Sequence, residues 1–386
     1  MSDIYLDNNA TTMLDPRVLN AMLPTLSEVG NPASAHQAGQ RARNSVEEAR
    51  RQVAGLLGSS PRELVFTSGA TEANNLALKG VARQAPGPRK RIVSATTEHP
   101  SILQTLEVLA GEGFEIVLVD VDSEGLVDLE RLKLAVNDET LFVTIMAANN
   151  ETGSLAPLAA IAEIAHDSGA LLHSDATQLL AWGGFDVEAM GVDLLSLSGH
   201  KLHGPQGVGA LYVRRQVSHR LKAIQHGGGH EHGLRSGTLN TAGIVGLGAA
   251  AELAELEGPG AAVRVRALRD VLHHKLQGTA PPVVLNGHLE QRLPGTLNLS
   301  FPGADAEAIM AGAPDVAIAT GSACSTGHSG PSHVLTAMGV DAEQAACSLR
   351  FGLSRFTLQD DVTTAAALVG ASASRVRETS REVVRL

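Results

Sequence analysis

Seven short apolar runs, with helical patterns between most of them, constrain the fold of this chain more than any other feature. Runs of four to seven apolar residues bounded by polar residues or glycine are typical of buried strands. Strands that alternate with helices are typical of a mainly parallel sheet with helices on both faces. The predicted strands lie at residues 63–67, 91–95, 114–119, 141–147, 170–174, 193–197 and 208–213. We therefore predict an α/β fold with a large, mostly parallel seven-stranded sheet.

The pattern changes in the last third of the chain. Two helices are predicted at 241–256 and 261–277, separated by the helix-breaking Gly258-Pro259-Gly260. Beyond residue 280, helical stretches separate short strands near 296–301, 315–320 and 347–353. This change predicts a second, smaller α+β domain. We expect a large domain over 13–260, and a small domain formed by 1–12 and 261–386.

Composition restricts the classes of partner. The chain has 386 residues and a formal net charge of −11, without a dense basic cluster, so neither nucleic acid nor a membrane is an expected partner. Its only cysteines are Cys324 and Cys347, which excludes a disulfide framework. The first residues lack the basic and apolar segments of a signal peptide, and no apolar run is long enough to cross a membrane. We therefore predict a cytoplasmic protein.

A lysine follows one of the predicted buried strands directly. The run at 193–197 leads into Ser198-Gly-His-Lys201. An amine at the carboxyl end of a buried strand can lie in a dry cleft, where a lowered pKa makes it a nucleophile. The most common use of such an amine is a Schiff base with pyridoxal phosphate. On its own Lys201 would be read as an ordinary surface lysine, so the other strand ends decide the interpretation.

Two of those strand ends lead into helices. Ser68-Gly-Ala-Thr71 lies between a predicted strand and a helix, where free backbone N–H groups and the Thr71 hydroxyl could bind a phosphate. The alternative is a helix start without a ligand. Thr97-Glu-His99 follows the strand at 91–95, and its histidine could stack on a flat ring and carry a proton. The alternative for His99 is a helix cap.

Three further strand ends carry polar side chains suited to the same cofactor. Asp175 ends one strand, and a carboxylate buried there needs a partner, such as the protonated nitrogen of a pyridine ring. Gln178 and Asn150 could hydrogen-bond the ring oxygen, although a turn is the simpler role for Asn150. Ser198 and His200, beside Lys201, are well placed to bind the phosphate.

The small domain adds two candidates. Arg355 follows the strand at 347–353, where its planar guanidinium could hold the carboxylate of an amino acid; the alternative is a surface arginine. Cys324 lies in a long stretch of small residues, Thr320 to Gly330. A cysteine in a flexible polar loop is the kind used as a nucleophile, whereas Cys347 fits a buried apolar position.

Taken together, these motifs resemble those of the cysteine desulfurases of the NifS/IscS type, in the class V aminotransferase family of pyridoxal-phosphate enzymes. The resemblance extends over nearly the whole chain, and the stretch around Cys324 is similar to that of group I desulfurases. The matching motifs are Tyr5-Leu-Asp-Asn-Asn-Ala-Thr-Thr12, Asn31-Pro-Ala-Ser34, Phe66-Thr-Ser-Gly-Ala-Thr-Glu72, Thr97-Glu-His99, Asn149-Asn-Glu151, Asp175-Ala-Thr-Gln178, Ser198-Gly-His-Lys201, Gly227-Gly-Gly-His230, Arg235-Ser-Gly-Thr238 and Gly321-Ser-Ala-Cys324.

The resemblance implies a fold-type-I transferase that binds pyridoxal 5′-phosphate, and it implies a role for each candidate. Lys201 would hold the cofactor as a Schiff base, Asp175 would pair with the ring nitrogen, and His99 would stack on the ring and carry a proton. Phosphate binding is implied for Ala70, Thr71, Ser198 and His200, and for Thr238 toward the cofactor of a partner subunit. Gln178 and Asn150 would contact the ring oxygen, and Arg355 with Asn150 would bind the substrate carboxylate. Cys324 would form the persulfide.

The implied reaction converts L-cysteine to L-alanine and leaves a persulfide on Cys324, in a homodimer that passes the sulfur to an acceptor protein. The acceptor stays open between iron–sulfur cluster assembly, tRNA thiolation and DNA phosphorothioation, because the chain ends at Leu386 where some members continue. A selenocysteine lyase or an aminotransferase on the same scaffold is the alternative reaction. A non-catalytic scaffold is disfavoured because Lys201, Asp175 and Cys324 are all present, and no metal site is expected.

Overall fold

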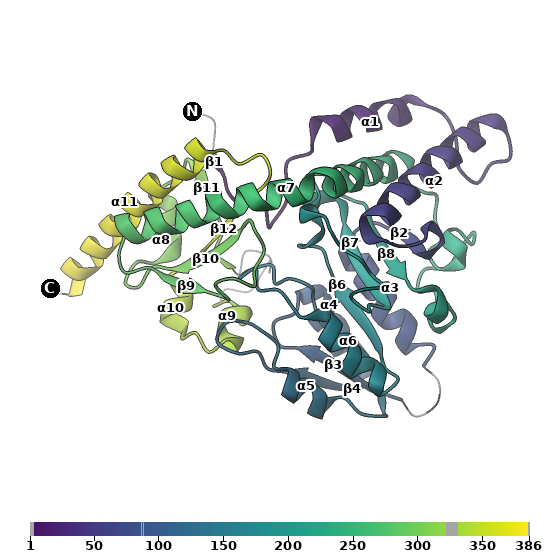
Figure 1. The fold of residues 1–386 in the computed structure, drawn as a ribbon, viewed down its shortest axis with the longest axis horizontal. Coiled ribbons are helices and arrows are strands. Elements are labelled where there is room, and N and C mark those ends of the chain that lie inside the picture. Colours follow the sequence, from purple (N-terminus) through teal and green to yellow (C-terminus); the bar gives the residue numbers. More distant parts are fainter. Residues whose placement is uncertain (1–3, 86, 88, 322–330, 385–386) are drawn as a thin grey trace.

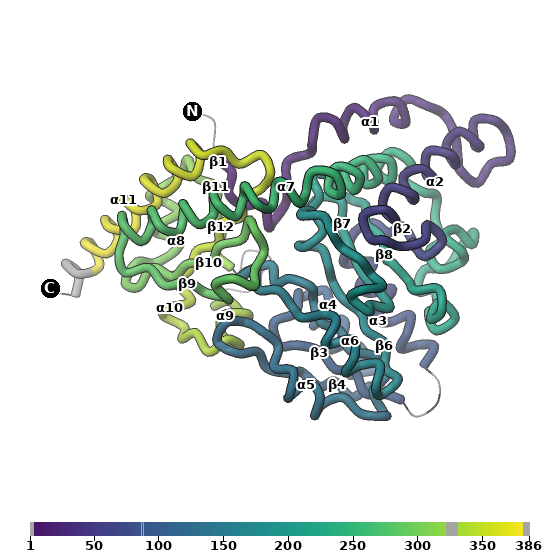
Figure 2. The backbone as a smooth tube through the Cα atoms, viewed as in Figure 1, coloured from purple at the N-terminus to yellow at the C-terminus, as the bar shows by residue number. Residues whose placement is uncertain are grey.

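The computed structural model describes residues 4–85, 87, 89–321 and 331–384 of the chain. Figure 1 shows two parts joined by one long helix, and Figure 2 follows the same path of the backbone as a tube. None of the helices in these residues is long and apolar enough to cross a membrane.

The larger part is built on a seven-stranded sheet with the strand order β2-β8-β7-β6-β5-β3-β4. Neighbouring strands from β7 to β4 pair in parallel, and only β8 runs against the others, because it pairs antiparallel with both β7 and β2. The predicted mostly parallel seven-stranded sheet is therefore confirmed. The strands are β2 (Leu64–Thr67), β3 (Arg91–Ala95), β4 (Glu115–Val119), β5 (Thr140–Thr144), β6 (Leu171–Asp175), β7 (Leu194–Ser198) and β8 (Gly209–Val213).

Helices cover both faces of this sheet because alternate strand residues point to opposite faces. On β7, Leu194 packs into the core under one set of helices and Leu195 into the core under the other. The first set is α3 (Ala70–Ala82) and α4 (Pro100–Gly111). The second set is α2 (Gln37–Leu57), α5 (Leu129–Ala135), α6 (Leu158–Asp167) and the first half of α7 (Thr241–Thr279), over which α1 (Pro16–Ser27) lies.

The prediction of two helices near residue 258 was wrong, because α7 runs unbroken from Thr241 to Thr279. Its Gly258 serves close packing instead of termination, since a Cβ there would come within 2.5 Å of the Trp182 backbone. Gly183, at the end of η2 (Leu180–Trp182), would in turn meet Pro259 and the carbonyl of Ala254. Gly258 and Pro259 therefore lie where the Trp182-Gly183 backbone crosses the helix.

The smaller part has its own core around a three-stranded antiparallel sheet, β12 (Ser348–Gly352), β10 (Thr296–Ser300) and β9 (Val284–Asn286). A parallel pair, β1 (Ile4–Tyr5) and β11 (Val316–Ala317), brings the start of the chain into it. The other elements are α8 (Ala306–Ala311), α9 (His333–Ala337), α10 (Ala342–Ala346) and α11 (Gln359–Val384). β9 was not predicted, because three residues carry too little periodicity.

We propose that the two parts correspond to the predicted domains, with 13–260 in the large domain and 1–12 with 261–386 in the small one. Two separate hydrophobic cores support this division. The first half of α7 packs into the core of the large sheet through Ala250 and Ala254, and the second half packs into the other core through Leu268 and Leu272.

A buried ion pair fastens the glycine-rich stretch 226–238 to the large sheet. Arg50 of α2 donates to both carboxylate oxygens of Glu231, at 3.0 and 2.7 Å, and the side chains are only 5% and 2% exposed. Glu231 also accepts from the backbone N–H of Phe66 on β2 at 2.7 Å, and the Arg50 guanidinium lies over the Phe66 ring. Loss of either partner would leave an uncompensated buried charge, which is far more costly than loss of an exposed pair.

We predict that Arg50→Met lowers the free energy of unfolding by about 3 kcal/mol, because Glu231 is left buried without its cation. Its sequence neighbour provides a matched control, since Arg51 is 58% exposed and pairs with the equally exposed Glu48. Arg51→Met should change the free energy of unfolding by less than about 1 kcal/mol. Urea unfolding followed by circular dichroism measures both, and equal effects of the two substitutions would contradict the prediction.

Candidate active site

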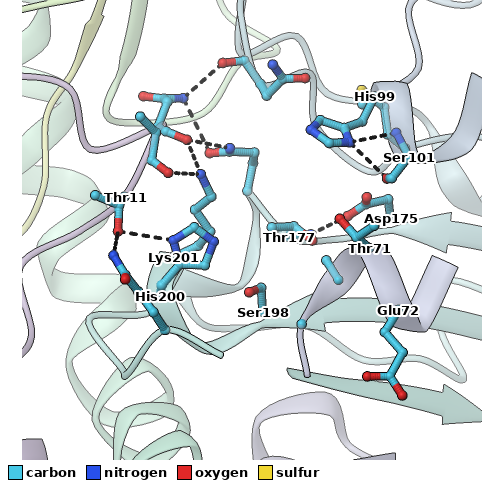
Figure 3. Close-up of a pocket in the computed structure, with 18 of the residues that line it drawn as sticks. Thr11, Thr71, Glu72, His99, Ser101, Asp175, Thr177, Ser198, His200 and Lys201 are labelled. Atoms are coloured by element: carbon cyan, nitrogen blue, oxygen red, sulfur yellow. Dashed lines mark hydrogen bonds between the residues drawn. The ribbon is translucent and has the colours of Figure 1, made fainter. Parts of the chain in front are cut away.

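A cavity of about 600 Å³ opens at the carboxyl ends of the parallel strands, which is where ligands bind in such sheets. Figure 3 shows side chains from several strand ends and from the start of α3 turned into it. The structure brings together here nine of the residues predicted from the sequence: Ala70, Thr71, His99, Asn150, Asp175, Gln178, Ser198, His200 and Lys201.

Lys201 reaches the cavity from η3 (Gly199–Lys201), directly after β7. Its Nζ donates to the backbone carbonyls of Asn9 and Ala10, the latter at 2.6 Å. The polar stretch that follows β1 therefore lines the cavity opposite the sheet. Nearby, His200 Nδ1 lies 3.1 Å from the Thr11 hydroxyl, and burial together with the charge of Lys201 lowers the pKa of His200 to about 4.

The start of α3 has the features of a phosphate site. Its N-cap is Gly69, with φ 150°, and no N-cap side chain caps the helix. Gly69, Ala70 and Thr71 line the cavity, so the first N–H groups of this 13-residue helix lie at its wall. A Cβ on Gly69 would lie 3.8 Å from Ser198 Oγ, which places the Ser198 hydroxyl beside the helix start. Glu72, in the same turn, is turned to the Ser68 N–H and to Arg235, at 2.6 and 2.7 Å.

Asp175 supplies the carboxylate at the end of β6. Its side chain accepts from Asn74 Nδ2 at 2.7 Å and from the Thr177 backbone N–H at 3.0 Å. Gln178, one turn later, donates from Nε2 to the Asn9 carbonyl at 3.0 Å. The carboxylate and the amide therefore line one wall of the cavity.

His99 is the N-cap of α4, as the alternative interpretation of its motif expected, and it also lines the cavity. Its Nδ1 accepts the Ser101 backbone N–H at 3.1 Å and lies 2.8 Å from the Ser101 hydroxyl. Burial lowers the pKa of His99, a shift that Lys201 and His333 reinforce and Asp175 opposes. The imidazole is therefore neutral near pH 7.

The residues of the cavity fit pyridoxal phosphate by their chemistry. They offer an amine for a Schiff base, a buried carboxylate for a ring nitrogen and an uncapped helix start for a phosphate. The buried hydroxyl of Thr177 and Nε of Arg355 have no hydrogen-bond partner among the residues that the structure describes, so polar groups at this end of the sheet are left for a ligand.

Arg355 lines a small adjoining cavity that it shares with Lys201 and Gln178. Its guanidinium donates to Asp15 Oδ2 at 2.7 Å, and its side chain is 8% exposed. It therefore lies next to the main cavity and is tied to the N-cap of α1.

Two predicted residues remain. Thr238 is exposed and lies outside the cavity of its own chain. Cys324 falls within 322–330, outside the described residues.

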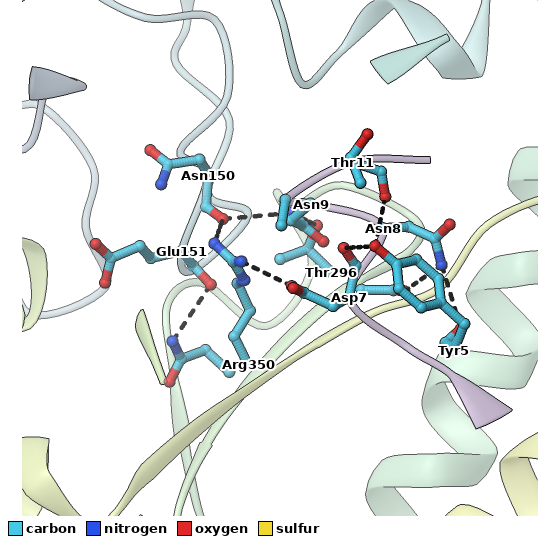
Figure 4. Close-up of polar contacts among 12 residues, drawn as sticks. Tyr5, Asp7, Asn8, Asn9, Thr11, Asn150, Glu151, Thr296 and Arg350 are labelled. Atoms are coloured by element: carbon cyan, nitrogen blue, oxygen red, sulfur yellow. Dashed lines mark hydrogen bonds and ion pairs between the residues drawn. The ribbon is translucent and has the colours of Figure 1, made fainter. Parts of the chain in front are cut away.

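Sequence analysis missed a second buried cation. Arg350, on β12, is fully buried, and it donates to Asp7 at 2.9 Å and to the Asn150 carbonyl at 3.1 Å. Figure 4 shows it between the stretch that follows β1 and the Asn149-Asn-Glu151 turn. Arg350 therefore holds Asn150, which lines the cavity, to the smaller sheet. The sequence pointed only to Arg355, because nothing in the pattern tells that the nearby Arg350 is fully buried.

Glu151 was quoted in a motif but received no role. It is 3% exposed, and Ser332 donates to its Oε2 at 2.5 Å. A Cβ on Gly321 would come within 2.2 Å of the same oxygen. Glu151 thus lies against Gly321, which precedes 322–330, and Ser332, which follows it by two residues. Burial raises the pKa of Glu151 to about 7.

Comparisons with known proteins agree with this geometry. Residues 4–364 match the family model of the class-V aminotransferases. A cysteine desulfurase IscS of Anaeromyxobacter dehalogenans (strain 2CP-C) is 48% identical over 379 residues, which cover 98% of this chain and 94% of the relative. A cysteine desulfurase of Rattus norvegicus is 45% identical over 361 residues, covering 93% of this chain and 80% of the relative.

Two solved structures have the same fold as this chain. A NifS-like protein superposes with a TM-score of 0.90 at 37% identity, covering 97% of this chain and all of the other. The structure of SspA in complex with cysteine superposes with a TM-score of 0.81 at 33% identity, covering 92% of this chain and 99% of the other.

These matches define a class of enzyme that uses pyridoxal phosphate and has the fold described above. The chain belongs to the class-V aminotransferase family, and within it to the cysteine desulfurases. The expected fold, cofactor and reaction type are thereby confirmed.

Glu151 generates a prediction about stability and pH. A carboxyl group whose pKa rises from 4.5 to about 7 on folding binds its proton more tightly in the folded state. Stability is therefore lost as the pH rises from about 4.5 to about 7, by about 3 kcal/mol in total. The variant Glu151→Gln keeps an acceptor for Ser332 but cannot ionise. Its free energy of unfolding, relative to wild type, should increase steadily across this range.

Urea unfolding at pH 5, 6, 7 and 8 measures this difference. The exposed Glu163 of α6 provides the control, because Glu163→Gln should differ from wild type by a constant amount. A constant difference for Glu151→Gln would show that its carboxyl titrates alike in both states.

Proposed function

We propose that this desulfurase removes sulfur from L-cysteine in the cavity at the carboxyl ends of the strands and transfers it to Cys324. The observation that carries the proposal is the convergence of Lys201, Asp175 and His99 on one cavity beside an uncapped helix start. When bound, pyridoxal phosphate supplies an electron sink that stabilises negative charge on the α-carbon of the substrate.

The lining of the cavity supports a role toward the cofactor for several of its residues. Lys201 would bind it covalently, and Asp175 would pair with the ring nitrogen. The start of α3 at Ala70 and Thr71 would bind the phosphate together with Ser198 and His200. Gln178 would meet the ring oxygen, and the His99 ring would cover one ring face. A neutral His200 suits this role, because it can donate to a phosphate without a second buried cation beside Lys201.

The substrate would be oriented by its carboxylate. Arg355 lies in the adjoining cavity with an Nε that no described residue bonds, and Asn150 lines the main cavity. Together they would hold the carboxylate so that the α-hydrogen faces Lys201, whose Nζ then takes the proton. Asp15 already pairs with Arg355, so the substrate carboxylate must share that guanidinium.

Sulfur transfer requires one bond to form and one to break. The Cys324 thiolate attacks the substrate sulfur, an S–S bond forms, and the C–S bond of the substrate breaks with its electron pair retained on the carbon side. Lys201 returns the α-proton, and the proton of the substrate thiol, relayed by His99, completes the methyl group of the product. L-cysteine and the Cys324 thiol thus become L-alanine and the Cys324 persulfide, with no other reactant consumed.

We also propose the assembly and setting in which this happens. The exposed Thr238 is free to reach a second copy of the chain, which supports a homodimer whose sites share the phosphate between subunits. A persulfide must be passed on, so a sulfur-acceptor protein is expected, with an iron–sulfur scaffold as the first candidate. A cytoplasmic location suits this chemistry, since Cys347 is a free thiol and the reaction needs reduced cysteine.

The thiol step makes a prediction that separates the two cysteines. Wild-type enzyme with L-cysteine and a reductant should release alanine and sulfide in equal amounts. Cys324→Ala should lower sulfide release by about 100-fold or more, because the attacking thiolate is gone, yet should keep the change in cofactor absorbance when L-cysteine is added. Cys347, buried in the smaller domain, is the control, and Cys347→Ala should keep full turnover.

The same assay distinguishes the other reactions on this scaffold. Sulfide release that survives Cys324→Ala would refute the role of Cys324. Retained release of selenide from selenocysteine by that variant, with sulfide lost, would indicate a selenocysteine lyase. Amino-group transfer to a keto acid without sulfide release would indicate an aminotransferase.

Arg355 makes a prediction about binding. Arg355→Lys keeps the charge but loses the planar pair of donors, so the KM for L-cysteine should rise about 10-fold or more with a smaller change in kcat. Asp15→Asn is the matched control, because it removes the ion pair and leaves the guanidinium in place. Steady-state kinetics of alanine formation measures both, and a KM that is raised equally in both variants would assign Arg355 a structural role.

A further inference from the structure

Asn74 is a buried amide that none of the roles above uses. It lies on α3, one turn after the helix start that faces the cavity, and its exposed fraction is 0%. Its Nδ2 donates to Asp175 Oδ2 at 2.7 Å and to Ser101 Oγ at 2.9 Å. Because a carboxylate oxygen accepts hydrogen bonds, the NH₂ end of the amide is the end that must face Asp175.

Only the NH₂ end of the Asn74 amide has hydrogen-bond partners among the described residues. Asn74 Oδ1 has no hydrogen-bond partner among the residues that the structure describes. A buried acceptor without a partner destabilises the fold, and an apolar side chain of the same size would avoid that loss. The two N–H bonds of Asn74 are therefore its distinctive contribution, and both go to groups at the cavity.

The second of these bonds leads to His99. Ser101 Oγ, which accepts from Asn74, lies 2.8 Å from His99 Nδ1, and the Ser101 backbone N–H donates to the same nitrogen at 3.1 Å. A nitrogen that accepts a backbone N–H carries no proton of its own. The Ser101 hydroxyl can direct its hydrogen to Nδ1 as well, while one of its two lone pairs accepts the Asn74 N–H, which fixes the orientation of the hydroxyl.

We propose that Asn74 is a positioning residue that joins Asp175 to His99 through Ser101, and that this chain of hydrogen bonds holds His99 neutral with its proton on Nε2. The inference deepens the proposed function and rests on it for the purpose of that proton. Protonation of Nδ1 would oppose the Ser101 N–H and would leave the Ser101 hydroxyl without its acceptor. The single N–H of the neutral His99 ring is thus confined to Nε2.

Groups from three other elements act on His99 by their charge. Asp175 on β6 favours the imidazolium, whereas Lys201 on η3 and His333 on α9 oppose it. His333 Nε2 lies 3.0 Å from the Glu98 carbonyl, next to His99. The substitutions chosen to test the chain of bonds leave Asp175, Lys201 and His333 unchanged.

The test is a titration of His99 by NMR in full-length enzyme loaded with pyridoxal phosphate and labelled with [¹⁵N]histidine. The His99 signals are those absent from a His99→Gln sample. In wild type we expect an unprotonated Nδ1 and a protonated Nε2 at pH 7. Asn74→Leu removes the N–H that orients the Ser101 hydroxyl toward Nδ1, so the hydroxyl can turn and accept from a protonated Nδ1, and the His99 pKa should rise by about 0.5 to 1 unit.

A double-mutant comparison identifies the route. If Ser101 transmits the effect, Asn74→Leu made together with Ser101→Ala should shift the pKa by less than half as much, relative to Ser101→Ala alone. Asn75→Leu is the matched control, since Asn75 is the next residue on α3 and bonds only the Thr71 carbonyl among the described residues. It should leave the titration unchanged.

Three outcomes would overturn the inference: no shift in Asn74→Leu, an equal shift with and without the Ser101 hydroxyl, or a wild-type proton on Nδ1. If Asn74→Leu fails to fold, Ser101→Ala alone still tests the chain, because it should change the His99 titration while Asn75→Leu does not. The NMR titration needs no turnover. Failure of the proposed function would appear separately, as wild-type enzyme that releases no sulfide from L-cysteine.

Discussion

The parallel pairing of β3, β5, β6 and β7 is the constraint on which the rest of the structure depends. Parallel strands end at the same edge of a sheet, so residues that follow different strands meet there although they are far apart in the chain. His99, Asn150, Asp175 and Lys201 each come shortly after one of these strands. The side chains themselves need only be polar and correctly spaced; the sheet brings them together.

A second level of organisation comes from buried polar groups around the stretch that follows β1. Arg350 reaches from the smaller sheet to Asp7 and to the carbonyl of Asn150, and Asn9 bonds Thr296 of β10 at 2.9 Å. These bonds are made in a dry interior, where a lost partner is costly. They hold the stretch after β1 against the cavity, where its backbone carbonyls accept hydrogen bonds from Lys201 and Gln178.

Much of this could be predicted from the sequence, for physical reasons. Apolar runs placed all seven strands of the large sheet, with helices between most of them, because that signal is local. The end of a helix at residue 258 was predicted wrongly, since close packing against Trp182 overrides the local preference of glycine and proline. Asn74, Ser101 and Arg350 could not be singled out, because their importance lies in contacts between distant segments.

The continuity of α7 has a mechanical consequence. Its first half belongs to one hydrophobic core and its second half to the other, so any rotation of one core relative to the other must bend this helix. Pro259 lies between the halves and supplies no backbone N–H, so the helix is one hydrogen bond short at that point. The Trp182-Gly183 backbone packs closely against α7 at this position. Any such bending would therefore be centred on α7 near Pro259, where the Trp182-Gly183 backbone crosses the helix.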